Sequence, residues 1–163
     1  QRQMCIRDSY YHEHIGYNYR MSNICAGIGR GQMEVVDEHI ARRRAIHSLY
    51  TEHLNGYKGI SVKQNPSEEY DSNFWLTCIE VDPAQCNGKS ADDIRLYLET
   101  QNVESRLLWR PMHMQPIFEG CPYYGDNVSE KIFERGLCLP SGSSLTDEQI
   151  MYVINSIKQY ISE

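Results

Sequence analysis

Polar and aromatic side chains are concentrated at the start of residues 16–32, where they could bind an anion. They offer phenol, amide and guanidinium groups: Tyr17, Asn18, Tyr19 and Arg20. The stretch runs directly into a helix that we expect to begin at Ser22, and hydrogen-bond donors at a helix N-terminus suit an anionic ligand. In the alternative interpretation, the tyrosines pack under the helix while Asn18 and Arg20 are solvated turn residues. Composition alone favours the alternative.

A second polar cluster lies at the end of a strand that we expect at residues 103–109. Arg106, Arg110 and His113 together could hold a phosphate or pyrophosphate, because arginine makes bidentate contacts and histidine can add a third. Trp109 lies among them. Arg106 could equally be an edge-strand residue paired with Glu104, and His113 could be a half-buried histidine that is satisfied by a backbone carbonyl.

Other motifs are weaker signals of chemistry. Residues 72–73 and 141–144 are polar turns at the ends of expected elements, and the second resembles a phosphate-binding turn only in outline. The sequence contains no G-x-S-x-G motif, and no cysteine lies at an evidently electropositive helix start. His12 and His14 form an isolated H-x-H without a second close pair of ligands, so we assign no metal site.

Composition limits the classes of protein to which the chain can belong. Its 163 residues are 40% hydrophobic, which suits one globular domain or slightly more. The net charge of −6 argues against nucleic acid as a partner, and no apolar window is long enough to span a membrane. The six cysteines are scattered, which indicates reduced thiols in a cytoplasmic protein.

The apolar pattern predicts three regions along the chain. Residues 1–9 have no strand or helix pattern, and we expect them to be a non-native leader. Residues 10–58 contain the polar loop and one long amphipathic helix, straight or bent, at 22–54. Gly27, Gly29 and Gly31 do not fit the dinucleotide-binding fingerprint, because the spacing is G-x-G-x-G and no strand precedes it; we expect them to allow another backbone to approach closely.

Residues 59–163 are expected to form a small α/β domain. Apolar and β-branched residues predict strands at 60–62, 74–81, 103–109 and 136–139. Helices are predicted at 91–101, after a capping Ser90, at 128–135, and from Thr146 to near the C-terminus. Strands separated by helices in about a hundred residues indicate an α/β layer packed beside the long helix.

Three segments, in the same order along the chain, carry a resemblance to a known family. They are Gly-Tyr-Asn-Tyr-Arg-Met-Ser-Asn at 16–23 followed by Gly-Arg-Gly-Gln at 29–32, Asn-Val-Glu-Ser-Arg-Leu-Leu-Trp-Arg-Pro-Met-His-Met-Gln-Pro-Ile-Phe at 102–118, and Gly-Leu-Cys-Leu-Pro-Ser-Gly-Ser-Ser-Leu-Thr at 136–146. The chain resembles the DegT/DnrJ/EryC1/StrS family of pyridoxal-phosphate-dependent nucleotide-sugar aminotransferases. The nearest branch aminates UDP-4-keto-6-deoxy sugars on the way to bacillosamine-type glycans.

The resemblance implies the C-terminal part of fold type I of the pyridoxal-phosphate enzymes, made of a long interdomain helix and a small α/β domain. It also implies a homodimer with active sites at the subunit interface, a UDP-sugar substrate and glutamate as amino donor. In the family, the Schiff-base lysine lies upstream of the Gly-Tyr-Asn-Tyr-Arg loop. The five lysines of this chain do not match its position, so we assign no catalytic residue here: Lys58, Lys63, Lys89, Lys131 and Lys158.

Individual residues take their implied roles from matched positions. Asn18, with Arg20 as second choice, is similar to the residue that reaches the cofactor phosphate of the partner subunit. Arg106, Trp109 and His113 are similar to residues of the substrate-facing segment. Two alternatives stay open: a sugar dehydratase of the same fold, in which histidine replaces the lysine, and a non-catalytic module that binds a nucleotide sugar or a protein partner.

Overall fold

The computed structural model describes Tyr19 and residues 21–163. The expected leader at 1–9, the H-x-H pair, Asn18 and Arg20 therefore lie outside the described residues. The chain divides between Val35 and Val36 into two compact units, and each is described by itself. Within the described part of the chain, no helix combines the length and apolar character that crossing a membrane requires.

The first unit contains helix α1 (Asn23–Glu34), which begins as predicted. The Ser22 hydroxyl accepts a hydrogen bond from the backbone N–H of Cys25 at 3.2 Å. The long helix predicted over 22–54, straight or bent, is interrupted at Val35 (φ −120°, ψ 8°), where the helical repeat stops. Glycines at 27, 29 and 31 weaken this segment by about 1 kcal/mol each relative to alanine. Among the described residues, no atom lies within 4 Å of a Cβ built on these glycines, and α1 has no buried residue.

The second unit is built on a four-stranded sheet with the strand order β1-β2-β4-β3. The strands are β1 (Ile60–Val62), β2 (Thr77–Val81), β3 (Arg106–Leu107) and β4 (Gly136–Leu139), and every neighbouring pair is antiparallel. Along β2, burial alternates strictly, so that Thr77, Ile79 and Val81 point into the core while Cys78 and Glu80 point to the other face. The sheet thus has one core face and one face that is partly open.

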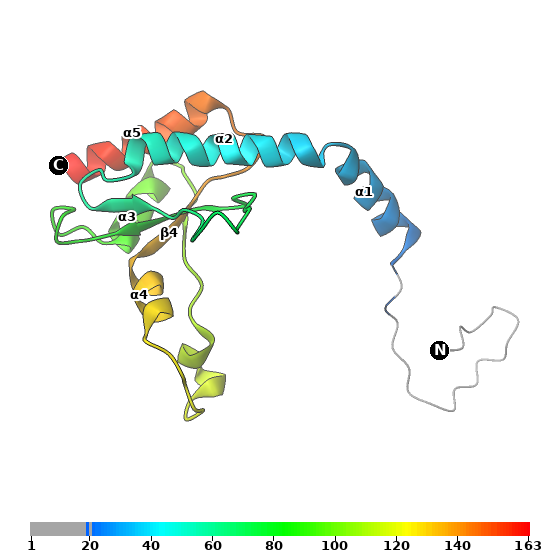
Figure 1. Ribbon diagram of the computed structural model, residues 1–163. Coiled ribbons are helices and arrows are strands. Elements are labelled where there is room, and N and C mark those ends of the chain that lie inside the picture. Colours follow the sequence, from blue (N-terminus) through cyan, green and yellow to red (C-terminus); the bar gives the residue numbers. More distant parts are fainter. Residues whose placement is uncertain (1–18, 20) are drawn as a thin grey trace, which may run out of the picture. The chain divides into compact units, whose positions relative to one another are not determined.

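Three helices cover the core face: α2 (Val36–Leu54), α3 (Ala91–Thr100) and α5 (Asp147–Ser162). Figure 1 shows α2 and α5 running beside each other, with the sheet beneath them. Their apolar side chains and those of the sheet form a single buried cluster that includes Ile46, Leu54, Ile79, Ile154 and Ile157. Each fully buried aliphatic side chain of this size stabilises the fold by about 1.5–3 kcal/mol. Strands and helices packed in layers confirm the predicted α/β class.

Two helices of the second unit start with the predicted caps. In α3, the Ser90 hydroxyl accepts from the N–H of Asp93, and the Asp93 carboxylate accepts from the N–H of Ser90. The Ser90 hydroxyl also donates to the Asp93 carboxylate at 2.6 Å, and this bond, together with the one from the Ser90 N–H, lowers the pKa of Asp93 because both stabilise its charged form. In α5, Thr146 and Gln149 form the same reciprocal arrangement. Such capping satisfies backbone N–H groups that have no partner within the helix.

Two strands are shorter than predicted. The expected strand at 74–81 forms only over β2, because side chains in the preceding turn occupy the backbone: Ser72 Oγ accepts from the N–H of Phe74, and Asn73 Oδ1 accepts from the N–H of Trp75. Phe74 also has a positive φ of 47°, which no strand tolerates. The expected strand at 103–109 is reduced to β3 at the sheet edge, and Pro111 soon follows it.

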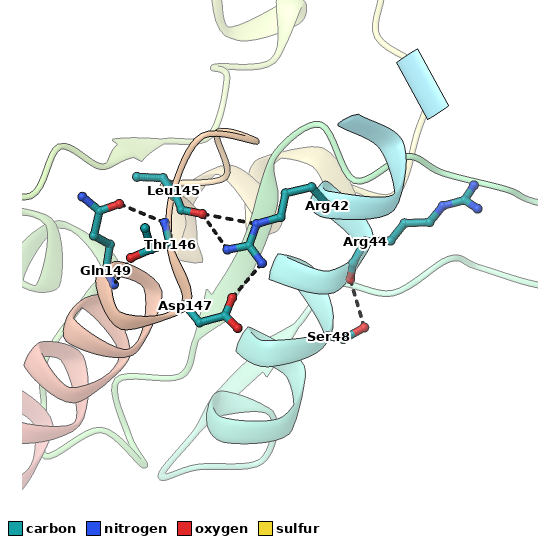
Figure 2. Close-up of polar contacts among 7 residues, drawn as sticks. All are labelled: Arg42, Arg44, Ser48, Leu145, Thr146, Asp147 and Gln149. Atoms are coloured by element: carbon teal, nitrogen blue, oxygen red, sulfur yellow. Dashed lines mark hydrogen bonds and ion pairs between the residues drawn. The ribbon is translucent and has the colours of Figure 1, made fainter. Parts of the chain in front are cut away.

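Arg42 fastens α2 to the start of α5. As Figure 2 shows, its guanidinium donates to the Leu145 carbonyl oxygen at 2.5 and 3.2 Å and to the Asp147 carboxylate at 2.7 Å. The Leu145 carbonyl immediately precedes the Thr146 cap, so the arginine reaches the one point where α5 changes from turn to helix. Asp147 is 64% exposed, and the net contribution of this ion pair is therefore small, about 0–1 kcal/mol. The main effect of Arg42 is to hold the start of α5 in place beside α2.

Tyr50 provides a direct test of the contact between α2 and the end of β4. Its side chain is fully buried, and its hydroxyl donates to the Pro140 carbonyl at 3.0 Å. Tyr50→Phe leaves that carbonyl without its partner, so we expect the free energy of unfolding to fall by about 1–3 kcal/mol in urea denaturation. The matched control is Tyr152→Phe, whose exposed hydroxyl donates to Gln101 at 3.3 Å; a loss below about 0.5 kcal/mol is expected there.

The same variant tests a pH effect. Burial raises the pKa of Tyr50 well above its ordinary value. The unfolded chain then ionises at lower pH than the folded chain, so this contribution to stability is present below about pH 10 and is lost as the pH rises further. Tyr50→Phe should make the alkaline decline in stability shallower. Equal slopes for the wild-type chain and the variant would contradict this account of Tyr50.

Candidate functional site

Trp75 and Trp109 form an exposed aromatic pair. Their ring centroids are 6.2 Å apart with planes tilted by 30°, and the residues are 58% and 67% exposed. Trp75 comes from the turn before β2, where Asn73 fixes its backbone, and Trp109 comes from the segment after β3. Two large apolar rings left in solvent offer flat surfaces on which a nucleobase or a sugar ring can stack.

His113 is held in one orientation by contacts on two sides. It lies in the short 3₁₀ helix η1 (Met112–Met114), and its Nε2 lies 2.7 Å from the Glu130 carboxylate of helix α4 (Val128–Arg135). Its ring also stacks on Tyr123 with centroids 3.8 Å apart. With Nε2 donating to the carboxylate, Nδ1 is the ring atom left to face a ligand. His113 is half-buried, as in the alternative interpretation, but its partner is a carboxylate and not a backbone carbonyl.

Arg106 follows the alternative that the sequence had left open. Its guanidinium donates to the Glu104 carboxylate at 2.6 and 2.9 Å, and its side chain is 80% exposed. It borders a shallow pocket of about 490 Å³ that Arg95 and Asn102 also line. Glu104 therefore neutralises Arg106 in this state, although an exposed pair of this kind contributes at most about 1 kcal/mol.

The joint hold of Arg106, Arg110 and His113 on a phosphate stays a prediction, because each of these side chains contacts a different group within the protein. Arg110 lies over the Phe133 ring at 5.7 Å. Ser141 is also used structurally: its buried hydroxyl accepts from the Thr77 N–H at 2.8 Å and donates to Leu139. The turn at 141–144 thus supports β2, and Ser141 has no free group for a phosphate.

Sequence reasoning missed three residues of the site. Trp75 was assigned to a strand, and neither Tyr123 nor Glu130 was connected to His113. Glu130 carried a usable signal, since it lies in the first turn of a helix that was predicted with its observed bounds, Val128–Arg135. Trp75 and Tyr123 carried none, because ring contacts between distant segments depend on the tertiary fold.

The lysines of the chain do not fit the covalent anchor of pyridoxal phosphate. Such an anchor is a buried amine next to the cofactor ring, whereas the lysine amines of this chain have structural partners or lie in solvent. Lys63 pairs with Glu80, Lys58 donates to Ser162, and Lys89 donates to the Tyr160 carbonyl. Lys158 lies over the Tyr57 ring, and Lys131 is exposed.

Gly136 brings the segment after β3 close to α4. A Cβ at this position would lie 1.9 Å from Leu108 Cδ1 and 2.5 Å from the Ile132 carbonyl oxygen. Leu108 immediately precedes Trp109, and Ile132 is two residues beyond Glu130. The missing side chain of Gly136 therefore sets the spacing between the two segments that carry the candidate site.

Comparisons with known proteins show which family and which proteins the chain is similar to. The model of the DegT/DnrJ/EryC1/StrS aminotransferase family matches residues 2–158. The chain is 41% identical over 144 residues to the "Putative pyridoxal phosphate-dependent aminotransferase EpsN" of Bacillus subtilis (strain 168) and 31% identical over 160 residues to the GDP-perosamine synthase of Escherichia coli O157:H7. These alignments cover 86% and 98% of this chain. The chain spans only 36% and 42% of the lengths of these two relatives.

A solved structure shows the same fold. The structure of DesI in the presence of its TDP-sugar product superposes with a TM-score of 0.78 and 26% sequence identity. The superposition covers 88% of this chain and 36% of that chain.

Gly136→Ala should disturb the spacing between Leu108 and α4. The new Cβ cannot be accommodated unless the Leu108 side chain and the Ile132 carbonyl shift. We therefore expect the free energy of unfolding to fall by about 1–3 kcal/mol. The matched control is Gly142→Ala, where the nearest atoms to the new Cβ are at 3.9 Å; it should be nearly neutral. Urea denaturation measures both, and equal effects would argue against a special close approach at Gly136.

Proposed function

The chain belongs to the DegT/DnrJ/EryC1/StrS aminotransferase family, and from this premise we propose that it is part of a pyridoxal-phosphate-dependent enzyme that aminates a nucleotide sugar. The family match over residues 2–158 carries the proposal. Two relatives are named as a pyridoxal phosphate-dependent aminotransferase and a GDP-perosamine synthase, and both are much longer than this chain. In the proposal, this chain supplies the substrate-facing part of the longer enzyme.

The specific reaction that we propose moves an amino group from glutamate to C4 of a UDP-4-keto-6-deoxy sugar, in the cytoplasm, for bacillosamine-type or related surface glycans. Pyridoxal phosphate, when bound, supplies the electron sink for amino transfer. The proposed enzyme is a homodimer in which Asn18, with Arg20 as second choice, contacts the cofactor phosphate of the partner subunit. The names of the relatives contain GDP, TDP and UDP sugars, so they do not identify the nucleotide, and the choice of UDP rests on the sequence resemblance.

Three described residues are proposed to bind the nucleotide sugar. Trp109, paired with Trp75, offers a stacking surface for a planar base. His113, oriented by Glu130, offers Nδ1 to a sugar or phosphate oxygen. Arg106 can contact the diphosphate by leaving Glu104, because the cost of breaking an exposed ion pair is at most about 1 kcal/mol and a phosphate contact with arginine is bidentate.

A chimera tests both the activity and the role of His113. We expect the Bacillus subtilis relative, with its aligned segment replaced by that of this chain, to form 2-oxoglutarate from glutamate when given a UDP-4-keto-6-deoxy sugar. His113→Ala in the chimera should lower kcat/KM by roughly 10- to 100-fold, the value of one hydrogen bond to a charged group, about 1.5–3 kcal/mol.

The control for this variant is Tyr124→Phe, which changes a 91% exposed ring of the same segment and should leave kcat/KM unchanged. GDP and TDP counterparts of the sugar, assayed in parallel, identify the nucleotide. A chimera that is folded and binds pyridoxal phosphate, yet aminates none of the three nucleotide sugars while its parent does, would overturn the proposal.

The 163-residue chain by itself should be inactive. With added pyridoxal phosphate it should show neither 2-oxoglutarate formation nor the visible absorption of a lysine-bound cofactor, because its five lysines have structural partners or lie in solvent. The measurement is a coupled assay together with borohydride reduction and peptide mapping, with the chimera as positive control. Turnover accompanied by cofactor fixed to one of the five lysines would contradict the assignment.

A further inference from the structure

Cys78 and Cys138 lie opposite each other on neighbouring strands. They are directly paired in the register of β2 and β4, and their sulfur atoms are 3.7 Å apart. Opposed residues of an antiparallel pair have Cα atoms about 4.5 or 5.5 Å apart, and a disulfide accepts about 4.4–6.8 Å. The backbone therefore already provides the separation that a disulfide between these two residues needs.

The two thiols differ in access to solvent. Both point to the sheet face opposite the core, since their neighbours Thr77, Ile79, Leu137 and Leu139 point into it. Cys78 is partly exposed and lines a pocket of about 480 Å³, together with Lys63 and Tyr70. Cys138 is only 5% exposed. A reagent in the pocket therefore reaches the sulfur of Cys78 first.

Local electrostatics also favour Cys78 as the attacking group. Its pKa is lowered, mainly by the hydrogen bond from the Cys138 thiol and additionally by the charge of Lys63. The pKa of Cys138 is raised, because its proton is held in that hydrogen bond and because the group is buried. Thiol–disulfide exchange needs the thiolate as nucleophile and a second thiol close enough to resolve the mixed disulfide.

We infer that Cys78 and Cys138 form a reversible dithiol modification site, in which Cys78 attacks a low-molecular-weight disulfide and Cys138 resolves the product. In the first step, the Cys78 thiolate bonds to one sulfur of oxidised glutathione and releases one glutathione thiolate, which takes up a proton. In the second step, Cys138 loses its proton, bonds to the Cys78 sulfur and releases the second glutathione. The two cysteines lose two electrons and two protons, and one glutathione disulfide becomes two glutathiones.

The test is peptide mapping of the full chain after incubation with oxidised glutathione without oxygen. We expect a peptide cross-linked through Cys78 and Cys138, which reverts on addition of dithiothreitol. In Cys138→Ser, the resolving thiol is missing, so one glutathione should stay on Cys78. In Cys78→Ser, the buried Cys138 should stay unmodified. Cys25→Ser/Cys121→Ser removes two exposed cysteines and should leave the cross-linked peptide unchanged.

If the site depends on the paired strands, the Cys78–Cys138 link should form only in the folded chain, whereas general thiol reactivity would not need the fold. Oxidation in denaturing urea should give mixed pairings in place of the Cys78–Cys138 peptide, and this comparison needs no variant. The inference is overturned if the folded wild-type chain carries glutathione on Cys25 or Cys121 but contains no Cys78–Cys138 peptide. It is also overturned if urea leaves the pairing unchanged, or if glutathione is trapped on Cys138 in Cys78→Ser.

Discussion

The packing of α2 and α5 on one face of the sheet is the constraint on which the second unit depends. A sheet with only short strands, two of them two or three residues long, cannot be stable unless one face is buried against other elements. The two helices supply that cover, and α3 extends it through the stacked rings of Tyr97 and Tyr160, whose centroids are 4.4 Å apart. Tyr50 and Arg42 then fix where the ends of β4 and α5 lie.

The candidate site, in contrast to the core, lies in a segment with little buried surface. Between β3 and α4, almost every side chain is exposed or only half-buried, and the segment is held by a few directed contacts: His113 with Glu130, its ring on Tyr123, and Trp109 with Trp75. A segment with little buried apolar surface has low local stability and can adjust to a ligand at small cost. Core packing positions its two ends, while Gly136 keeps it close to α4.

Local signals explain what the sequence predicted well. The caps at Ser22, Ser90 and Thr146 lie within three residues of their partners, so helix starts could be read directly. The strand at 74–81 was predicted too long, because aromatic residues suit strands and the competing turn bonds of Ser72 and Asn73 are equally local but weaker as signals. A bend in the long helix was allowed for, but its place at Val35 could not be predicted, since the apolar spacing continues across it. Contacts such as Trp75 with Trp109 require strand order and register, which no local pattern contains.

Side chains along β2 and β4 alternate between the two faces of the sheet, so the same register determines both the packing of the core and the contact between the two thiols. Period-two geometry places Ile79 and Leu137 in the core and, at the same register, places Cys78 beside Cys138 on the other face. A slip of one residue between these strands would separate the thiols and expose the core residues together. The contact between the two sulfurs is therefore fixed by the same register that buries the core, and the thiols remain together wherever the sheet is folded. Six scattered cysteines give no indication of this pairing, because it exists only after β2 and β4 have paired.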